Sequence, residues 1–273
     1  MKRFIKVACI QLAASSDWQK NWAALETVLH RTVMQKPDVI VLPENFIVRT
    51  TEKMLRQVVR PAVKQVLSGL KKFSKKYGIT IIAGSVPEVL PGTKKHANTC
   101  FVFSPAGKTI LRYRKMHLFD VNLPKVKVQE SNVLKPGTKS GYFKLGSLKA
   151  GVGICYDLRF PEYFRLLSQK GAEVIFIPAN FTAETGKTAW EVLLRARAIE
   201  NQCYVVAAGQ CGRHQGSGIL SYGNSMIIDS LGRVIKRAGM SRPQVLMATL
   251  DLAVLRKGRQ RLPALKHRKI RTF

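Results

Sequence analysis

The chain alternates between short apolar runs and longer segments with helical periodicity. Residues 5–12 alternate as a strand does, and residues 39–42 form a continuous apolar run that is typical of a buried strand. Between them, residues 18–35 repeat apolar side chains every three to four positions, which predicts an amphipathic helix. The same patterns predict further strands at 80–85, 96–103, 109–113, 148–154, 174–177, 203–208, 225–229 and 245–251, and further helices at 52–77, 161–170 and 190–201.

Proline, glycine and aperiodic stretches mark the connections. Pro61 predicts a break or a new start inside the 52–77 helix, because proline lacks the backbone N–H. Residues 114–141 have neither period and predict a long irregular segment, a kind of segment that often carries function. Alternating strands and helices, without a linker rich in glycine or serine, predict a single α/β domain over 1–273, with a basic C-terminal extension from about residue 252.

The net charge of +30, from 46 basic and 16 acidic residues, raises the question of nucleic-acid binding. The basic residues are spread along the whole chain, without an aromatic-interleaved RNA motif or zinc-finger spacing. We therefore interpret the charge as typical of a basic proteome or as a general attraction for anionic substrates, rather than as a specific nucleic-acid site.

Cysteine spacing and hydropathy indicate the cellular compartment in which the protein works. The five cysteines include no Cys-x-x-Cys pair and no Cys/His ligand spacing, which predicts neither disulfides nor a metal site and favours a reducing cytoplasm. No apolar run reaches about eighteen residues, so no membrane-spanning helix is predicted. Lys6 and Gln11 interrupt the opening segment, which therefore resembles a first strand more than a signal peptide.

Cys155 is placed where a nucleophile is expected. The strand at 148–154 stops at this residue, and Pro161 and Glu162 then begin a helix. A thiol at the end of a buried strand, just before a helix, is held rigidly, as nucleophiles are on α/β scaffolds. Because cysteine is also often buried as a small apolar residue, this position alone leaves both interpretations open.

Three charged residues share this placement at strand ends or in loops. Glu44 follows the strand at 39–42, Lys115 follows the strand that ends at Tyr113, and Glu130 lies in the long irregular segment. Together with a thiol they could converge on one rim of the molecule. Taken singly, a carboxylate after a strand is often a helix cap or a surface charge, and a lysine among 46 basic residues is most often solvated.

Four short blocks follow one another along the chain: Leu42-Pro-Glu44, Lys115-Met-His-Leu-Phe-Asp120, Gly153-Ile-Cys-Tyr-Asp157 and Phe160-Pro-Glu162. In this order they resemble the signature of the carbon–nitrogen hydrolase (nitrilase) superfamily. The similarity spans residues 5 to about 251. Within the superfamily, residues 190–208, 210–214 and 262–268 resemble the Nit branch, which comprises deaminated-glutathione amidases and the related ω-amidases.

The resemblance implies a fold and a set of catalytic residues. The fold is a four-layer α-β-β-α sandwich, and the implied catalytic residues are Glu44, Lys115 and Cys155, with Glu130 as an additional glutamate that positions groups around the thiol. Glu44 is expected to accept the thiol proton. Lys115 and the backbone N–H of Tyr156 are expected to form the oxyanion hole. No metal or organic cofactor is needed, and a homodimer or larger assembly is expected.

Substrate contacts are expected close to the nucleophile. Arg159 matches an arginine that grips a substrate carboxylate in one branch of the superfamily, although an ion pair with a neighbouring carboxylate such as Glu162 is an equal alternative. Asn180, Phe181 and Thr182 follow the strand at 174–177 and are expected to contact substrate or to form a simple turn. Ala189 and Asn224 depart from the pattern of the relatives, in segments that bear on substrate preference.

These observations predict a cytoplasmic amidase, independent of cofactors, that acts on a small anionic amide. The expected reaction cleaves deaminated glutathione to 2-oxoglutarate and Cys-Gly. The alternatives are an ω-amidase that acts on 2-oxoglutaramate and, from another class, an inactive protein that binds nucleic acid through its basic surface.

Overall fold

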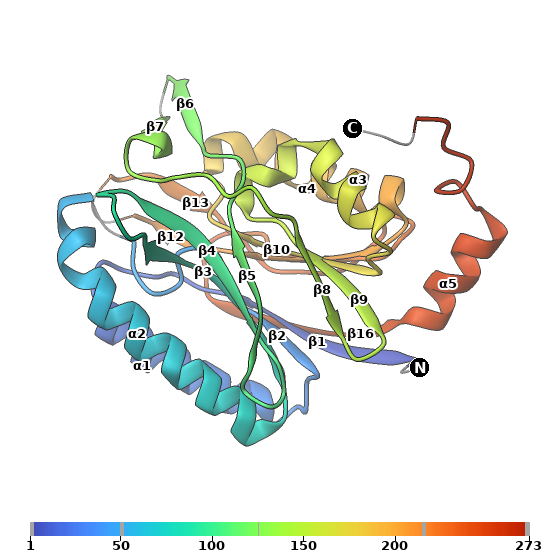
Figure 1. The fold of residues 1–273 in the computed structure, drawn as a ribbon, viewed down its shortest axis with the longest axis horizontal. Coiled ribbons are helices and arrows are strands. Elements are labelled where there is room, and N and C mark those ends of the chain that lie inside the picture. The colour runs from blue at the N-terminus through green and yellow to red at the C-terminus, as the bar shows by residue number, and fades with distance from the viewer. Residues whose placement is uncertain (1–2, 50–51, 125, 215–216, 271–273) are drawn as a thin grey trace.

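Two mixed sheets pack face to face between two pairs of helices (Figure 1). The computed structural model describes residues 3–49, 52–124, 126–214 and 217–270, with the side chains of the second helix described from residue 61. Within these residues, the first sheet has the strand order β16-β1-β2-β3-β4-β5 and the second has the order β15-β14-β11-β10-β9-β8. Helices α1 and α2 cover the first sheet, and α3 and α4 cover the second (Figure 1). The expected four-layer α-β-β-α sandwich is confirmed.

The elements of the two sheets and their helices have the following bounds. The strands of the first sheet are β1 (Phe4–Gln11), β2 (Val39–Val41), β3 (Thr80–Val89), β4 (His96–Phe103), β5 (Thr109–Arg114) and β16 (Gln244–Asp251). Those of the second are β8 (Gly141–Leu145), β9 (Leu148–Val152), β10 (Val174–Ala179), β11 (Tyr204–Gly209), β14 (Met226–Ile228) and β15 (Val234–Arg237). The helices are α1 (Trp18–Val33), α2 (Glu52–Tyr77), α3 (Pro161–Gln169), α4 (Ala183–Asn201) and α5 (Leu252–Arg261).

Each central strand is apolar on both faces because both faces are covered. In β1, Val7 and Cys9 belong to the core that joins the two sheets, whereas Ala8 and Ile10 belong to the core beneath α1 and α2. Successive side chains of a strand point to opposite faces, so a strand between two apolar layers needs an unbroken apolar run. This requirement explains why these strands were readable from the sequence.

Two expectations about local structure are wrong. Helix α2 continues through Pro61 without the expected break. Proline costs a helix one backbone hydrogen bond, but Ala62, Val66 and Leu70 keep the following turns packed on the first sheet. The segment expected to be irregular contains the hairpin β6 (Asp120–Leu123) and β7 (Val126–Gln129) and the 3₁₀ turn η1 (Glu130–Asn132).

Several elements were not expected. Strand β8 forms the edge of the second sheet, and β12 (Cys211–Arg213) pairs with β13 (Leu220–Tyr222). Helix α5 lies near the beginning of β1 and places Leu252 and Leu255 in the core (Figure 1). Its short apolar stripe among basic residues gave little periodic signal. Among the described residues, no helix is long and apolar enough to cross a membrane.

Candidate active site

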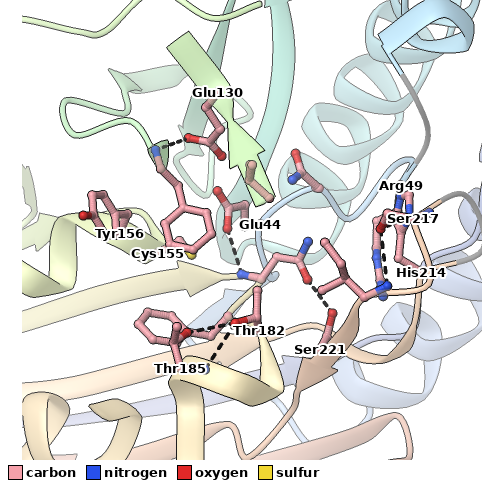
Figure 2. Close-up of a pocket in the computed structure, with 16 residues that line it drawn as sticks. Glu44, Arg49, Glu130, Cys155, Tyr156, Thr182, Thr185, His214, Ser217 and Ser221 are labelled. Atoms are coloured by element: carbon pink, nitrogen blue, oxygen red, sulfur yellow. Dashed lines mark hydrogen bonds between the residues drawn. The ribbon is translucent and has the colours of Figure 1, made fainter. Parts of the chain in front are cut away.

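Cys155 lies at a sharp turn between a strand and a helix. Strand β9 ends at Val152, and Cys155 begins the 3₁₀ turn η2 (Cys155–Arg159) with a φ of +48°. Residues other than glycine rarely adopt this left-handed backbone conformation, and such strained positions are common at functional sites. The thiol is 7% exposed and lines a cavity of about 170 Å³ (Figure 2).

Lys115 joins two carboxylates in the wall of this site. Its ammonium Nζ donates hydrogen bonds to Glu44 Oε1 at 3.1 Å and to Glu130 Oε2 at 2.9 Å. Both Lys115 and Glu44 are almost fully buried. The three residues come from the ends of β5 and β2 and from η1, so the sheets and the 114–141 segment bring together charges that are far apart along the chain.

Glu44 is fixed by more than its ion pair. Its Oε1 also accepts a hydrogen bond from Asn98 Nδ2 at 2.7 Å, and its Oε2 accepts one from the backbone N–H of Asn180 at 2.8 Å. The carboxylate is thereby oriented from β4 on one side and from the end of β10 on the other. Asn98 was not identified from the sequence, because an asparagine inside a strand gives no sign of its distant partner.

Burial and charge set the protonation of the cluster. Burial opposes the charged form of Lys115, but the negative charges of Glu130 and Glu44 outweigh it and raise the lysine pKa well above its usual value. Burial, and then the charge of Glu44, raise the pKa of the Cys155 thiol well above its usual value. Burial also raises the pKa of Glu130 despite the opposing charge of Lys115. In the resting state Cys155 is therefore a thiol and Lys115 an ammonium.

Asp157 anchors the turn that carries Cys155. Its Oδ2 accepts hydrogen bonds from Ile154 N at 2.8 Å and from the Tyr113 hydroxyl at 2.7 Å. Its Oδ1 accepts two more, from the backbone N–H of His117 at 3.0 Å and from His117 Nδ1 at 2.7 Å. This buried carboxylate ties the nucleophile turn to the end of β5 and the start of the 114–141 segment.

Of the residues expected to contact substrate, some line the cavity and Arg159 does not. Tyr156, Asn180, Phe181 and Thr182 line the cavity with Cys155. The Thr182 hydroxyl also caps α4 by accepting a hydrogen bond from Thr185 N at 3.3 Å. Arg159 is not among the lining residues, and its guanidinium lies 5.7 Å from the centre of the Phe181 ring. Among the ion pairs of the described residues, none joins Arg159 to Glu162.

Other lining residues were missed. Arg49, His214, Ser217 and Ser221 complete one side of the cavity, as Figure 2 shows. Nothing in the sequence singles out Arg49 among 46 basic residues. In the ranges that the structure describes, no group of three or more His, Cys, Asp or Glu side chains is arranged to hold a metal ion.

Known proteins resemble this chain in sequence over nearly its whole length. Residues 6–260 match the model of the carbon-nitrogen hydrolase family. A deaminated glutathione amidase from Synechocystis is 37% identical over 98% of this chain and 99% of its own length. The ω-amidase NIT3 of Saccharomyces cerevisiae is 36% identical over 98% of this chain and 94% of its own length.

Solved structures show the same likeness. The crystal structure of yeast Nit3, a member of branch 10 of the nitrilase superfamily, superposes with a TM-score of 0.88 at 33% identity, and covers 99% of this chain and 98% of its own. The NitFhit protein of C. elegans superposes with a TM-score of 0.92 at 32% identity, over 98% of this chain and 66% of that one. The chain therefore belongs to the carbon–nitrogen hydrolase family, within the Nit branch of the nitrilase superfamily.

Proposed function

We propose that this protein is an amidase that cleaves the carbon–nitrogen bond of a small anionic substrate through a thioester on Cys155. The observation that carries the proposal is the Glu44–Lys115–Glu130 charge cluster, whose two glutamates line the same cavity as Cys155. A proton acceptor and a thiol in one cavity, with an ammonium hydrogen-bonded to the acceptor, are the groups that acyl transfer requires.

Acylation begins with proton transfer, because the raised pKa of Cys155 keeps the sulfur protonated at neutral pH. Glu44 accepts the thiol proton as the sulfur attacks the amide carbonyl carbon. The tetrahedral intermediate then collapses: the carbon–nitrogen bond breaks, and Glu44 passes its proton to the departing amine. The acyl group remains on Cys155 as a thioester.

Hydrolysis of the thioester repeats the sequence with water. Glu44 takes a proton from water, the hydroxyl attacks the thioester carbon, and the sulfur leaves and recovers the proton from Glu44. In both halves, negative charge develops on the carbonyl oxygen. Lys115 and the backbone N–H of Tyr156 are the proposed donors to this oxygen, and loss of one such donor costs about 10²–10³-fold in turnover.

The high pKa of Lys115 supports this role. The charges of Glu130 and Glu44 keep the buried amine protonated across the physiological range, so the positive charge is present before the substrate arrives. A charge that is already oriented needs no rearrangement during the reaction. Glu130 supports the arrangement by accepting a second hydrogen bond from the ammonium, at 2.9 Å.

The proposed substrate is deaminated glutathione, cleaved to 2-oxoglutarate and Cys-Gly, and the second candidate is 2-oxoglutaramate, which releases ammonia. Relatives of similar identity bear both names, which is why both candidates stand. Both amides carry the same acyl group, so the same acylation chemistry serves either. We further propose a single domain that acts in the cytoplasm as a homo-oligomer, without a cofactor and without a specific nucleic-acid partner.

Side-by-side assays of 2-oxoglutarate release test the proposal. Purified protein is given each of the two amides, and Cys155→Ala is compared with Cys203→Ala, which removes a buried thiol outside the cavity. We expect Cys155→Ala to abolish turnover and Cys203→Ala to retain it. Turnover by a folded Cys155→Ala protein would refute the thioester mechanism. Absence of turnover in the parent, together with salt-sensitive DNA binding, would favour the nucleic-acid alternative.

A further inference from the structure

Arg197 is a buried arginine of α4 that contacts the turn carrying Cys155. The residue is 4% exposed. Its Nε and Nη2 both donate hydrogen bonds to the carbonyl oxygen of Leu158, at 3.1 and 2.8 Å, and Leu158 is the third residue after Cys155 in η2. The remaining Nη1 donates to Glu200 Oε1, on the same helix, at 2.9 Å. The guanidinium therefore joins α4 to the nucleophile turn.

Arg197 acts on the site only through the backbone of this turn. The residues that line the cavity do not include it, so its side chain does not meet a substrate bound there. A partly buried ion pair adds little to stability, because removing charges from water offsets their attraction. A guanidinium at this place is therefore better explained by the carbonyl oxygen that it holds than by its pairing with Glu200.

The turn has to be held because its first residue is strained. Cys155 has a φ of +48°, and a residue keeps such a conformation only when the surrounding contacts over-determine it. Asp157 fixes the beginning of the turn by accepting a hydrogen bond from Ile154 N at 2.8 Å. Arg197 fixes the other end through Leu158, so the strained residue lies between two anchored points.

We infer that Arg197 is a positioning residue, which keeps Cys155 Sγ in its reactive place by anchoring the Leu158 carbonyl. This inference rests on the proposed function, in which Cys155 is the nucleophile. Without the anchor the turn relaxes toward an unstrained backbone, and the sulfur moves relative to Glu44. A displacement of about 1 Å between reacting groups costs up to about 100-fold in rate. The loss therefore falls on the chemical step rather than on substrate binding.

Arg195 provides a matched control on the same helix. Its Nε donates to the Gly232 carbonyl oxygen at 2.8 Å, and its Nη1 lies 3.7 Å from Glu191 Oε1. Like Arg197, it joins α4 to a distant carbonyl oxygen and to a glutamate about one helical turn away. Gly232 lies between β14 and β15, however, so Arg195→Gln removes contacts of the same kinds without touching η2.

Turnover measurements test the effect on the chemical step. For Arg197→Gln we expect kcat to fall about 10- to 100-fold with the amide that the parent cleaves faster, and KM to change less than about twofold. For Arg195→Gln we expect both constants to stay within about twofold of the parent values. A kcat like that of the parent in a folded Arg197→Gln protein would overturn the inference.

Alkylation of Cys155 by iodoacetamide separates positioning from a merely structural role. Peptide mass spectrometry follows Cys155 and the buried Cys9 in the same sample. Looser packing speeds the alkylation of both thiols, whereas a sulfur displaced from its proton acceptor reacts more slowly. For Arg197→Gln we expect Cys155 to react about 10-fold more slowly than in the parent and in Arg195→Gln, with Cys9 as protected as in the parent. A rate at Cys155 equal to that of the parent, or faster, would overturn the inference.

Two provisions keep the test decisive. If the parent hydrolyses neither amide, the proposed reaction fails, while the alkylation rates still decide the role of Arg197. If Arg197→Gln does not fold, as judged by circular dichroism, Arg197→Lys takes its place. Lysine keeps the charge but has a single ammonium, which cannot hold Leu158 and Glu200 as the guanidinium fork does. We then expect Cys155 alkylation to be severalfold slower than in the parent, and an unchanged rate would overturn the inference.

Discussion

Asp157→Asn tests whether one buried carboxylate holds the nucleophile turn in place. Asp157 is fully buried and accepts four hydrogen bonds, two at each oxygen. Asparagine has nearly the same shape but only one acceptor oxygen. If that oxygen keeps the two His117 donors, the new amide group faces the N–H of Ile154, which then loses its only acceptor among the described contacts.

The expected cost follows from these contacts. An unsatisfied buried donor costs about 1–3 kcal/mol, and weakening charge-assisted bonds adds to it, so we expect a loss of about 2–4 kcal/mol in the free energy of unfolding. The Tyr113 hydroxyl can rotate to accept from the amide, which limits the loss. For a chain of this size the change corresponds to a Tm lower by about 5–10 °C.

Thermal melting and amide hydrolysis, measured on the same samples, check this prediction. Because Asp157 lies two residues from Cys155, we also expect kcat to fall about 10-fold or more, since small displacements of reacting groups are costly. Asp17→Asn is the matched control: Asp17 caps α1 by accepting hydrogen bonds from Gln19 N and Lys20 N, and asparagine caps helices equally well. A Tm of Asp157→Asn within about 2 °C of the parent would contradict this reasoning.

Two further predictions concern packing and pH. A Cβ at Gly84 would lie 1.9 Å from the carbonyl oxygen of Pro43, the residue before Glu44. Gly84→Ala should therefore destabilise the fold by about 1–3 kcal/mol and lower turnover. Gly258 lies in α5 with open space around it, so Gly258→Ala should instead stabilise the fold by about 0.5–1 kcal/mol. Urea melts of both variants and activity assays check the opposite signs. Burial raises the pKa of Cys203 to about 12, so the folded state keeps this proton after the unfolded chain has lost it above about pH 8.5. Stability should therefore fall as pH rises, and the loss between pH 7 and 10 should be about 2 kcal/mol smaller in Cys203→Ala than in the parent; identical losses would argue against it.

The sequence by itself determined the places of the main strands, and its resemblance to a known family implied the architecture. Strands β1, β2, β10 and β11 are buried on both faces, so their apolar runs are local signals of position in a sandwich. Glu44, Lys115 and Cys155 were candidates because each follows a readable strand, and the resemblance then implied their roles. Pro61 and helix α5 show what a local pattern cannot predict. Packing against the first sheet keeps α2 helical through Pro61 although proline disfavours a helix, and packing of Leu252 and Leu255 into the core stabilises α5 although its apolar stripe is weak.

Only the tertiary structure decided how the charges of the site are paired. The bond from Asn98 to Glu44 joins residues 54 positions apart, and that from Tyr113 to Asp157 joins residues 44 positions apart. Arg49 was indistinguishable from other basic residues until folding buried two of its nitrogens without a hydrogen-bond partner among the described residues. Hydrophobic burial follows a pattern along the chain, whereas the pairing of buried polar groups depends on which distant segments meet, and no local pattern encodes that meeting.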